Sequence, residues 1–439
     1  MVEPESVVKN ALRLGAQDVV VSSESKSTTQ VKFVNDQVAV SQSWSEDKLD
    51  IFLALDKRLV STTITPHDQE STDLLLEKLL SRARVTAPKE EYNGIAEGPF
   101  KYKKVIGGYD KKVAHMENHG ALIKDAIEAS KEEGAKRASG VLETCVYSRS
   151  LFTSNGVAAA EDGTTLFLSI RAFAGDGSGH GVSCSRGLDK FEPLDAGRRA
   201  GEIARLGKKP VNGRKGEYRV LFDPLAFAPL VEVTGEAASI FSVEAGFSYL
   251  ADKLGRRIGN NNITLTDDAR LEDGFLSRSF DEEGVPTQRN LILQKGVLMG
   301  YLHNTSTARR YGTETTANAG LIRPRPWNLV LRQGRGRRKD RLEELDHGIY
   351  ITNTWYTRFQ NYMTWDFSTM PRDGIFLVEG GEIQASLKGI RISDNLSRIF
   401  KSVEWASKER KQIRSWEVGG SVTSPWVIVD GLRITRATR

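Results

Sequence analysis

Histidine is the residue type on which a zinc hydrolase in this chain would depend, because neutral imidazoles are frequent ligands of catalytic zinc. Two of the six histidines, His115 and His119, form the sequence HMENH, whose four-residue spacing would place both on one face of a helix. A zincin carries its general base directly after the first histidine, but that position is Met116 here. The pattern therefore favours a solvated helical face. The alternative to this interpretation is an independent metal-dependent peptidase whose metal ligands are not recognised. The other histidines of the chain are His67, His180, His303 and His347.

A glycine-rich run, GDGSGHG at residues 175–181, is the second feature that could do chemistry. A phosphate-binding loop lies between a strand and the N-terminus of a helix, whose N–H groups bind the anion. The residues that follow here, VSCSRGLDKFEP, are strand-like, so the run predicts a flexible hairpin or loop. No Gly-x-Ser-x-Gly elbow and no Cys–His arrangement in the sequence indicates nucleophilic catalysis.

Basic residues cluster in one segment, RQGRGRRKDR at residues 332–341. It has no interleaved aromatic residues on which the bases of a single-stranded nucleic acid would stack, which is evidence against nucleic acid as a partner. The simplest interpretation is a mobile, solvated loop. The alternatives are contact with an acidic substrate or partner, or a binding or scaffold protein that uses this basic loop. The arginines concerned are Arg332, Arg335, Arg337 and Arg338.

Composition limits the class of protein. A hydrophobic content of 39% with 27% charged residues is typical of a soluble globular chain, and a net charge of +5 does not demand nucleic acid. No apolar run approaches the roughly 18 residues that a membrane-spanning helix needs, and the N-terminal residues lack the pattern of a signal peptide. Two cysteines, Cys145 and Cys184, are too few for a disulfide framework. These observations predict a cytoplasmic protein without a membrane partner.

The first part of the chain is predicted to be an α+β domain over residues 1–85. Residues 18–64 hold short stretches that alternate apolar with polar residues, separated at Asn-Asp, Glu-Asp and Asp-Lys pairs, which is typical of antiparallel strands. Leucines at helical spacing predict a helix over Asp73–Arg84. Residues 86–106 contain prolines and glycines among charged residues and are predicted to be a linker.

Two further units follow the linker. Residues 107–207 form a second α/β region of the N-terminal half, with predicted helices over Lys111–Glu133 and Asp195–Leu206. Residues 216–439 open with a strand and a helix and then hold mostly strand-like segments with glycine turns, as in LQKGVL and VEGGEI. The sequence therefore predicts an α+β fold: an N-terminal antiparallel sheet with helices, followed by a β-rich C-terminal domain.

Several blocks, in the same order, resemble the TldD/PmbA (modulator of DNA gyrase) metallopeptidase family over most of the chain. They are ALRLGAQDVVVS near the N-terminus, residues 191–232 from FEPLDAGRRAGEIARL onward, DEEGVPTQRN and the residues that follow to 320, LDHGIYITNTW, and DGIFLVEGGEI. One block alone would be weak evidence, whereas five blocks in the same order make the resemblance specific. The resemblance implies the family's fold and a peptidase-like C-terminal domain.

The resemblance also implies where a zinc site would lie. In the catalytic branch of the family, a helix after the domain-crossing strand carries His-Glu-x-x-x-His, and a late cysteine completes the ligand set. The matching segment here is VEVTGEAASIFS, in which Gly235 and Ile240 stand at the histidine positions and Glu236 keeps the glutamate. No cysteine follows Cys184. The resemblance is therefore to the TldE/PmbA branch, which lacks the zinc motif, and it implies that this chain has no catalytic residue and no metal ligand.

The branch implies a function as well. This chain would be the non-catalytic subunit of a complex with a TldD-like catalytic subunit, as a heterodimer or a larger assembly, with the zinc bound by the partner. The complex would cleave unfolded or flexible peptides, and the chain alone could form a homodimer. An extended peptide substrate is expected to add as a strand to an exposed sheet edge.

Overall fold

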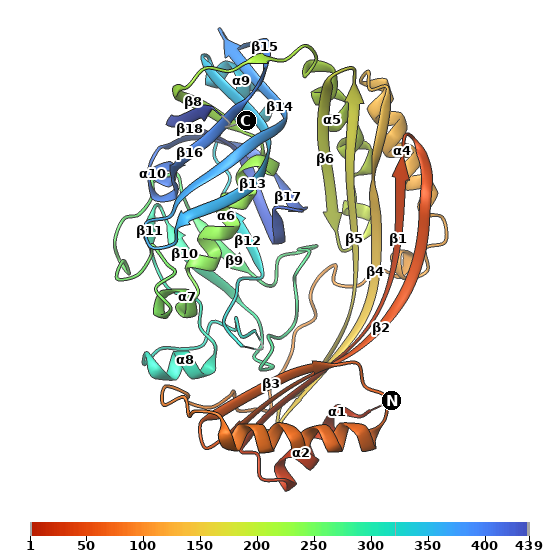
Figure 1. Cartoon of the computed structure of the whole chain (residues 1–439), viewed down its shortest axis with the longest axis vertical. Helices are drawn as coiled ribbons and strands as arrows, with labels where there is room; N and C mark the ends of the chain where they lie inside the picture. Colours follow the sequence, from red (N-terminus) through yellow and green to blue (C-terminus); the bar gives the residue numbers. More distant parts are fainter. Residues whose placement is uncertain (1, 321, 437–439) are drawn as a thin grey trace.

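A long, curved antiparallel sheet forms the N-terminal half of the computed structural model, which describes residues 2–320 and 322–436 (Figure 1). The strands lie in the order β3-β2-β1-β4-β5-β6. Because β1 pairs with β4, the residues before and after the 86–106 segment share one sheet. The strands are β1 (Asp18–Val34), β2 (Gln37–Leu55), β3 (Arg58–Ile64), β4 (Arg137–Thr153), β5 (Ala158–Ala174) and β6 (Gly177–Ser185).

The strands of this sheet are longer than the sequence predicted. The turns at Asn35–Asp36 and Asp56–Lys57 are confirmed, with all four residues at positive φ, as two-residue hairpin turns of this kind require. The predicted break at Glu46–Asp47 is wrong, because both residues pair with β1 inside one continuous strand. Charged residues are tolerated there because residues 37–48 of β2 are largely exposed to solvent.

Five helices accompany the N-terminal sheet. Helices α4 and α5 pack against each other on it, and α5 also contacts the C-terminal domain through Ile203 (Figure 1). The predicted helix over Lys111–Glu133 is wrong as a single element: it is two helices, because the Asn118 side chain accepts a hydrogen bond from the Ala121 amide at 3.1 Å and caps a new helix. The helices are α1 (Pro4–Arg13), α2 (Gln69–Val85), α3 (Lys111–Ala114), α4 (His119–Glu132) and α5 (Pro193–Leu206), with a 3-10 turn at Leu188–Lys190.

The glycine-rich run forms the β5–β6 hairpin and the first part of β6, as the sequence predicted. Its glycines have a packing role, since a Cβ at Gly177, Gly179 or Gly181 would lie only 2.0–2.2 Å from backbone oxygens of α5. The absence of side chains therefore lets α5 lie directly on β6.

The C-terminal domain is built on a larger sheet in the order β11-β10-β9-β12-β18-β8-β13-β14-β15-β7. In addition, β16 pairs with both β14 and β18, and β17 pairs with β18. Its predicted glycine hairpin turns are confirmed, at Lys295–Gly296 and Gly380–Gly381, all at positive φ. The strands are β7 (Val211–Asn212), β8 (Gly216–Phe222), β9 (Leu265–Asp268), β10 (Arg289–Gln294), β11 (Val297–Leu298), β12 (Asn328–Leu331), β13 (Gly348–Asn361), β14 (Asp366–Glu379), β15 (Glu382–Lys388), β16 (Ile390–Asn395), β17 (Val403–Ser415) and β18 (Val418–Arg436).

Few helices accompany this sheet, so the predicted α+β fold with a β-rich C-terminal domain is confirmed. Among the described residues, no helix combines the length and the apolar composition needed to cross a bilayer. The helices of this half are α6 (Pro224–Ala237), α7 (Ile240–Glu244), α8 (Thr305–Arg310), α9 (Arg341–Leu345) and α10 (Leu396–Lys401), with a 3-10 turn at Arg338–Asp340.

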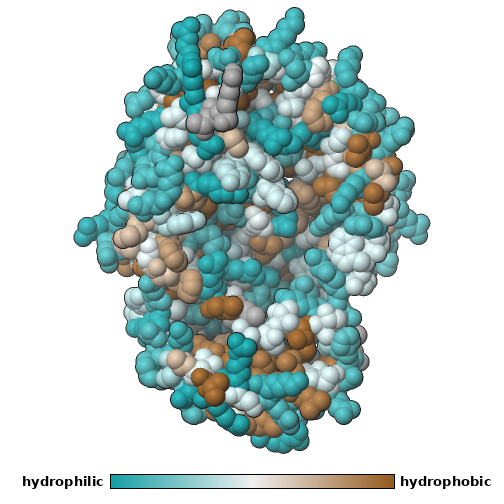
Figure 2. Space-filling view, viewed as in Figure 1, coloured by the Kyte–Doolittle hydropathy of each residue, from teal (hydrophilic) through white to brown (hydrophobic). Residues whose placement is uncertain are grey.

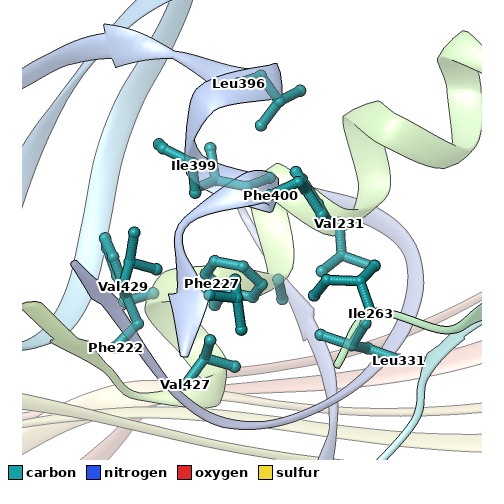
Figure 3. Close-up of a cluster of buried hydrophobic side chains, with 14 of the residues drawn as sticks. Phe222, Phe227, Val231, Ile263, Leu331, Leu396, Ile399, Phe400, Val427 and Val429 are labelled. Carbon is teal, nitrogen blue, oxygen red and sulfur yellow. The ribbon is translucent and has the colours of Figure 1, made fainter. Parts of the chain in front are cut away.

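Helix α6 lies inside the C-terminal domain and organises its core (Figure 3). Phe227, in its first turn, is fully buried and has its ring centroid 5.6 Å from that of Phe222 and 5.9 Å from that of Phe400. Burying one such side chain stabilises a fold by about 1.5–3 kcal/mol. Most residues of α6 are buried in the same way, which fixes the helix in the domain.

The segment over residues 86–106 has no helix or strand, in agreement with its prediction as a linker, but it is packed rather than free. The Asn93 amide donates to Ser306 Oγ at 2.9 Å, and the Tyr102 hydroxyl donates to the Gly284 carbonyl at 2.8 Å. The segment thus joins the N-terminal sheet to the C-terminal domain. In the same view as Figure 1, this face is hollowed between the lower N-terminal elements and the domain above (Figure 2).

Candidate functional site

The predicted zinc-site helix breaks before it reaches Ile240. Helix α6 ends at Ala237, and Ser239 adopts an extended conformation from which its hydroxyl donates to the Pro324 carbonyl at 2.7 Å. Ile240 then begins α7, with its amide donating to the Leu302 carbonyl at 3.1 Å. The single helix over residues 231–242 is therefore wrong, and Gly235 and Ile240 belong to different helices.

Neither of these two positions could hold a metal ion. A Cβ at Gly235 would lie 2.3 Å from Leu329 Cδ1, so the space beside α6 that a larger side chain would need is filled by Leu329. Ile240 is 1% exposed and carries no ligating atom. Among residues 2–320 and 322–436, no group of three or more His, Cys, Asp or Glu side chains is arranged to bind a metal. The residues at the predicted zinc site do not fit the ion.

Glu236 faces a pocket of about 420 Å³ between α6 and the strands β12 and β18. Its carboxylate is half-buried and lies 4.0 Å from Arg323 Nη2. Burial raises the pKa of Glu236, and the charges of Arg323 and Arg325 offset part of that rise. The remaining lining includes Glu232, Leu276, Arg278, Arg325, Trp327 and the backbone of Gly419–Ser421.

Glu232 lies one helical turn before Glu236, so both carboxylates point to the same side of α6. Glu232 Oε1 accepts a hydrogen bond from the Gly420 amide at 2.6 Å. Burial raises the pKa of Glu232, and the neighbouring Glu236 adds to the rise. The pocket thus combines acceptors with guanidinium donors and an aromatic wall, a set suited to binding a peptide backbone rather than activating water.

His115 and His119 are not brought together on one helical face. His115 ends α3, whereas His119 begins α4 and its Nε2 lies 2.9 Å from Thr144 Oγ1. The break between the two helices therefore removes the geometry that the HMENH spacing suggested.

His180 lies in a buried polar cluster but does not form a catalytic triad. Its Nδ1 lies 3.1 Å from the Asn353 amide nitrogen, which donates, so the ring proton is on Nε2 and points to Ser169 Oγ at 2.9 Å. The imidazole therefore cannot accept the serine proton, as a general base must. Burial lowers the pKa of His180 to about 4, which keeps the ring neutral. The cluster joins the two halves of the chain, since Asp373 accepts from Ser178 Oγ of β6 at 2.7 Å and from Asn353 at 3.1 Å.

The basic segment is docked on β17 by its backbone, so the expectation of a free loop is wrong. Its Gly334 amide donates to the Ser407 carbonyl at 2.8 Å. The Arg338 guanidinium lies 4.6 Å from the Trp426 ring centroid, while Arg332, Arg335 and Arg337 remain exposed. None of these four arginines lines the Glu236 pocket, so the structure does not bring the two groups of predicted site residues together. Contact with a substrate or partner stays a prediction.

Family models match most of the chain. The PmbA/TldA metallopeptidase C-terminal domain matches residues 215–436, which is half of the chain, and the central domain matches residues 109–207. The chain belongs to the PmbA/TldD metallopeptidase family. The family resemblance inferred from the sequence blocks is thereby confirmed.

Relatives of this family agree with that assignment. A metalloprotease of Methanocaldococcus jannaschii is 26% identical over 364 residues, which are 78% of each chain. The metalloprotease PmbA of Escherichia coli O157:H7 is 30% identical over 191 residues, or 43% of this chain and 40% of PmbA. The crystal structure of TldE from Thermococcus kodakarensis superimposes with a TM-score of 0.86 at 19% identity, over 98% of this chain and 99% of TldE, and so shows the shared fold.

The family block DEEGVP, at residues 281–286, is anchored by a buried acid. Asp281 Oδ1 accepts from the amides of Glu283 and Val285 at 2.9 and 3.0 Å, and Oδ2 accepts from the Ala319 amide at 3.0 Å. These bonds fix the loop that carries Glu282 and Glu283. Sequence reasoning quoted this block only as a resemblance and assigned no site to it.

A larger pocket, missed by the sequence analysis, lies beside this loop. It has a volume of about 600 Å³ and is bounded by β1–β3 and the 86–106 segment on one side and by α7 and α8 on the other. We call it the interdomain pocket. No sequence pattern could indicate it, because its walls come from segments separated by some two hundred residues that only the fold brings together.

Ile240 provides a test of the packing at the altered zinc position. Replacing Ile240 with alanine should lower the free energy of unfolding by about 2–5 kcal/mol, because the side chain is buried and its removal leaves a cavity. Chemical denaturation of both proteins measures the difference. The neighbouring Phe241 is 38% exposed, so Phe241→Ala is the control and should cost less. Equal stability of Ile240→Ala and the parent would show that the position is not packed.

Proposed function

We propose that this chain is the non-catalytic subunit of a zinc peptidase complex that cleaves unfolded or flexible peptides. The observation that carries the proposal is the pair of residues at the expected ligand positions. Gly235 is packed against Leu329, and Ile240 is buried on a separate helix, so the local structure has been built around apolar contacts. This chain thus has the fold of a family that includes metalloproteases, but the residues at its expected metal site do not fit a metal.

The partner in this proposal is a TldD-like subunit that provides the zinc and the general base. This chain would contribute one wall of the space in which the peptide lies. The Glu236 pocket supports that role, because its carboxylates and guanidinium groups can pair with the N–H and C=O groups of an extended backbone without selecting side chains. Arg332, Arg335 and Arg337 are exposed and available for contact with a partner or an acidic substrate.

An unpaired sheet edge supports the existence of a partner. β2 pairs with β1 along nearly its whole length, but β3 covers its other edge only over residues 49–55. Residues 37–48 therefore leave one edge without a strand partner among the described residues. Over residues 37–45, QVAVSQSWS, this edge has no charged residue and no proline, which are the devices that keep edge strands of monomers from pairing.

We assign this edge to the partner subunit rather than to the peptide. Over residues 37–45 it has no charged side chain, and Val38 and Val40 within it are 53% and 45% exposed. Burying such an edge by adding a strand of a similar fold satisfies its backbone groups and covers these valines. A homodimer formed through the same edge would be the state of the chain alone.

Glu236 tests the absence of catalysis in this subunit. In a complex with a TldD-like catalytic subunit, Glu236→Gln should leave the rate of peptide cleavage within about twofold of the parent, since a general base would be worth about 100-fold or more. Cleavage of a fluorogenic unfolded peptide measures the rate. The matched control is the same substitution at the glutamate of the partner's zinc motif, which should abolish activity. A loss of 100-fold with Glu236→Gln in an intact complex would contradict the proposal.

The edge of β2 is tested by a pair of proline substitutions. Ser41 and Gln42 are adjacent, so one amide points toward β1 and the other points outward. Proline at the outward position should leave thermal stability nearly unchanged and prevent association, whereas proline at the inward position should destabilise the sheet. Light scattering with and without the catalytic subunit measures association. If both folded variants still associate but no longer bind peptide, the edge belongs to the substrate instead.

A further inference from the structure

The interdomain pocket has apolar walls contributed by both halves of the chain. Phe52 and Ile95 come from the N-terminal side, and Phe241 and Pro324 come from the C-terminal side. Its volume of about 600 Å³ is in the range of pockets that enclose small ligands or several residues of a peptide. Pockets of this kind commonly use a small number of polar groups to orient what they bind.

Glu283 is a buried acidic residue in the wall of this pocket. Glu283 is only 8% exposed, and one of its carboxylate oxygens accepts a hydrogen bond from the Thr305 amide at 3.2 Å. No ion pair of Glu283 occurs among residues 2–320 and 322–436. The preceding residue is the opposite case, because Glu282 lies 3.1 Å from Arg149, 2.8 Å from Arg278 and 3.7 Å from Arg325. A buried carboxyl without a counter-ion is costly unless it is protonated or matched by a bound group.

No charged residue that lines the pocket forms an ion pair with Glu283 among the described residues. Glu244 and Arg310 form an ion pair with each other, and Lys89 and Glu91 are exposed. Burial raises the pKa of Glu283 and the charge of Asp281 raises it further, while hydrogen bonding to Thr305 and the charge of Arg309 offset part of the rise. The interior of the pocket is therefore apolar with one acidic group whose charge is unbalanced.

We propose that the interdomain pocket binds a primary ammonium group attached to an apolar peptide residue, with Glu283 as the counter-ion. The apolar part would pack between Phe52, Ile95 and Phe241, and the ammonium would supply the ion-pair partner that Glu283 lacks among the described residues. Binding would release the proton that Glu283 holds. This inference rests on the proposed peptide-binding function and names the class of peptide that the chain would select.

The ammonium could come from two sources, a free amino terminus or a lysine side chain. Three short peptide amides distinguish them. The first begins with phenylalanine and has a free amino terminus, the second is the same peptide acetylated, and the third is acetylated with lysine after the phenylalanine. Calorimetric titration of the purified full chain, without partner and without added metal, measures each affinity. A failure here would thus leave the proposed role in the complex untouched, because no catalysis is involved.

Either the peptide with a free amino terminus or the lysine peptide should bind at least about tenfold more tightly than the acetylated peptide without lysine. A tenfold difference in affinity corresponds to about 1.4 kcal/mol of binding free energy. Whichever of these two ammonium-bearing peptides binds more tightly identifies the source of the ammonium. Titration in buffers with different enthalpies of ionisation should show proton release on binding. Equal affinity for all three peptides, or no binding by any, would overturn the proposal without any variant being needed.

Three substitutions locate the effect. Glu283→Gln keeps the size of the side chain and an acceptor for the Thr305 amide, and it should remove both the preference for the ammonium and the proton release. Glu91→Gln, at an exposed lining residue of the same charge, is the matched control and should change neither. Phe241→Ala should weaken all three peptides equally. Retention of the preference in a folded Glu283→Gln protein would place the counter-ion elsewhere.

Discussion

The burial of α6 inside the C-terminal domain is the constraint on which the rest of the structure depends. Most of its side chains, beginning with Phe227 in the first turn, are buried among apolar neighbours, and only one side of the helix faces a pocket. Where Gly235 faces Leu329, a larger residue would require the leucine side chain to move. Where the chain leaves the helix, Ser239 turns it so that Ile240 is buried on α7. A metal site cannot be restored at such positions by small movements, because the surrounding core is close-packed.

A second interaction holds the two halves of the chain together. Arg149 of β4 reaches Glu282 in the C-terminal domain and Glu161 of β5 at the same time. The arginines around Glu282 lower its pKa to about 2 although burial alone would raise it, so this carboxylate is a permanent anion. The loop fixed by this ion cluster carries three acids in a row with three different environments. Asp281 is satisfied by backbone amides, Glu282 by arginines, and Glu283 only in part, which is why it is the one available to a ligand.

Local sequence signals predicted the elements whose determinants are local. The turns at Asn35–Asp36 and Asp56–Lys57 and the glycine hairpins follow from residues that tolerate positive φ, and the leucine spacing gave α2. The errors fell where a side chain overrode the pattern: Asn118 capped a new helix within a continuous helical stretch, and Ser239 ended the zinc-site helix early. Glu46–Asp47 was misread as a turn because charges at an exposed edge look like a break. The contacts of Ser239 and of Glu46–Asp47 are formed with distant parts of the chain, whereas the Asn118 cap is local.

The candidate site could be predicted only in part. Gly235, Glu236 and Ile240 were found through resemblance to a family, since nothing in their spacing alone marks them. Their packing, and the partners of Glu236, depend on Leu329, Arg323 and Arg325, which lie some ninety residues away. The interdomain pocket and the unpaired state of Glu283 were out of reach for the same reason. Both depend on which segments meet across the domain boundary and on which charges fail to meet there.

Zinc content is the most direct test of the claim that this chain has no metal site of its own. The chain would be purified without its partner, at neutral pH and without chelator, incubated with zinc and dialysed, and its metal measured by elemental mass spectrometry. The account predicts a zinc content close to zero per chain. A stoichiometric zinc that survives dialysis would contradict it and would mean that ligands other than those at the family's motif hold the metal.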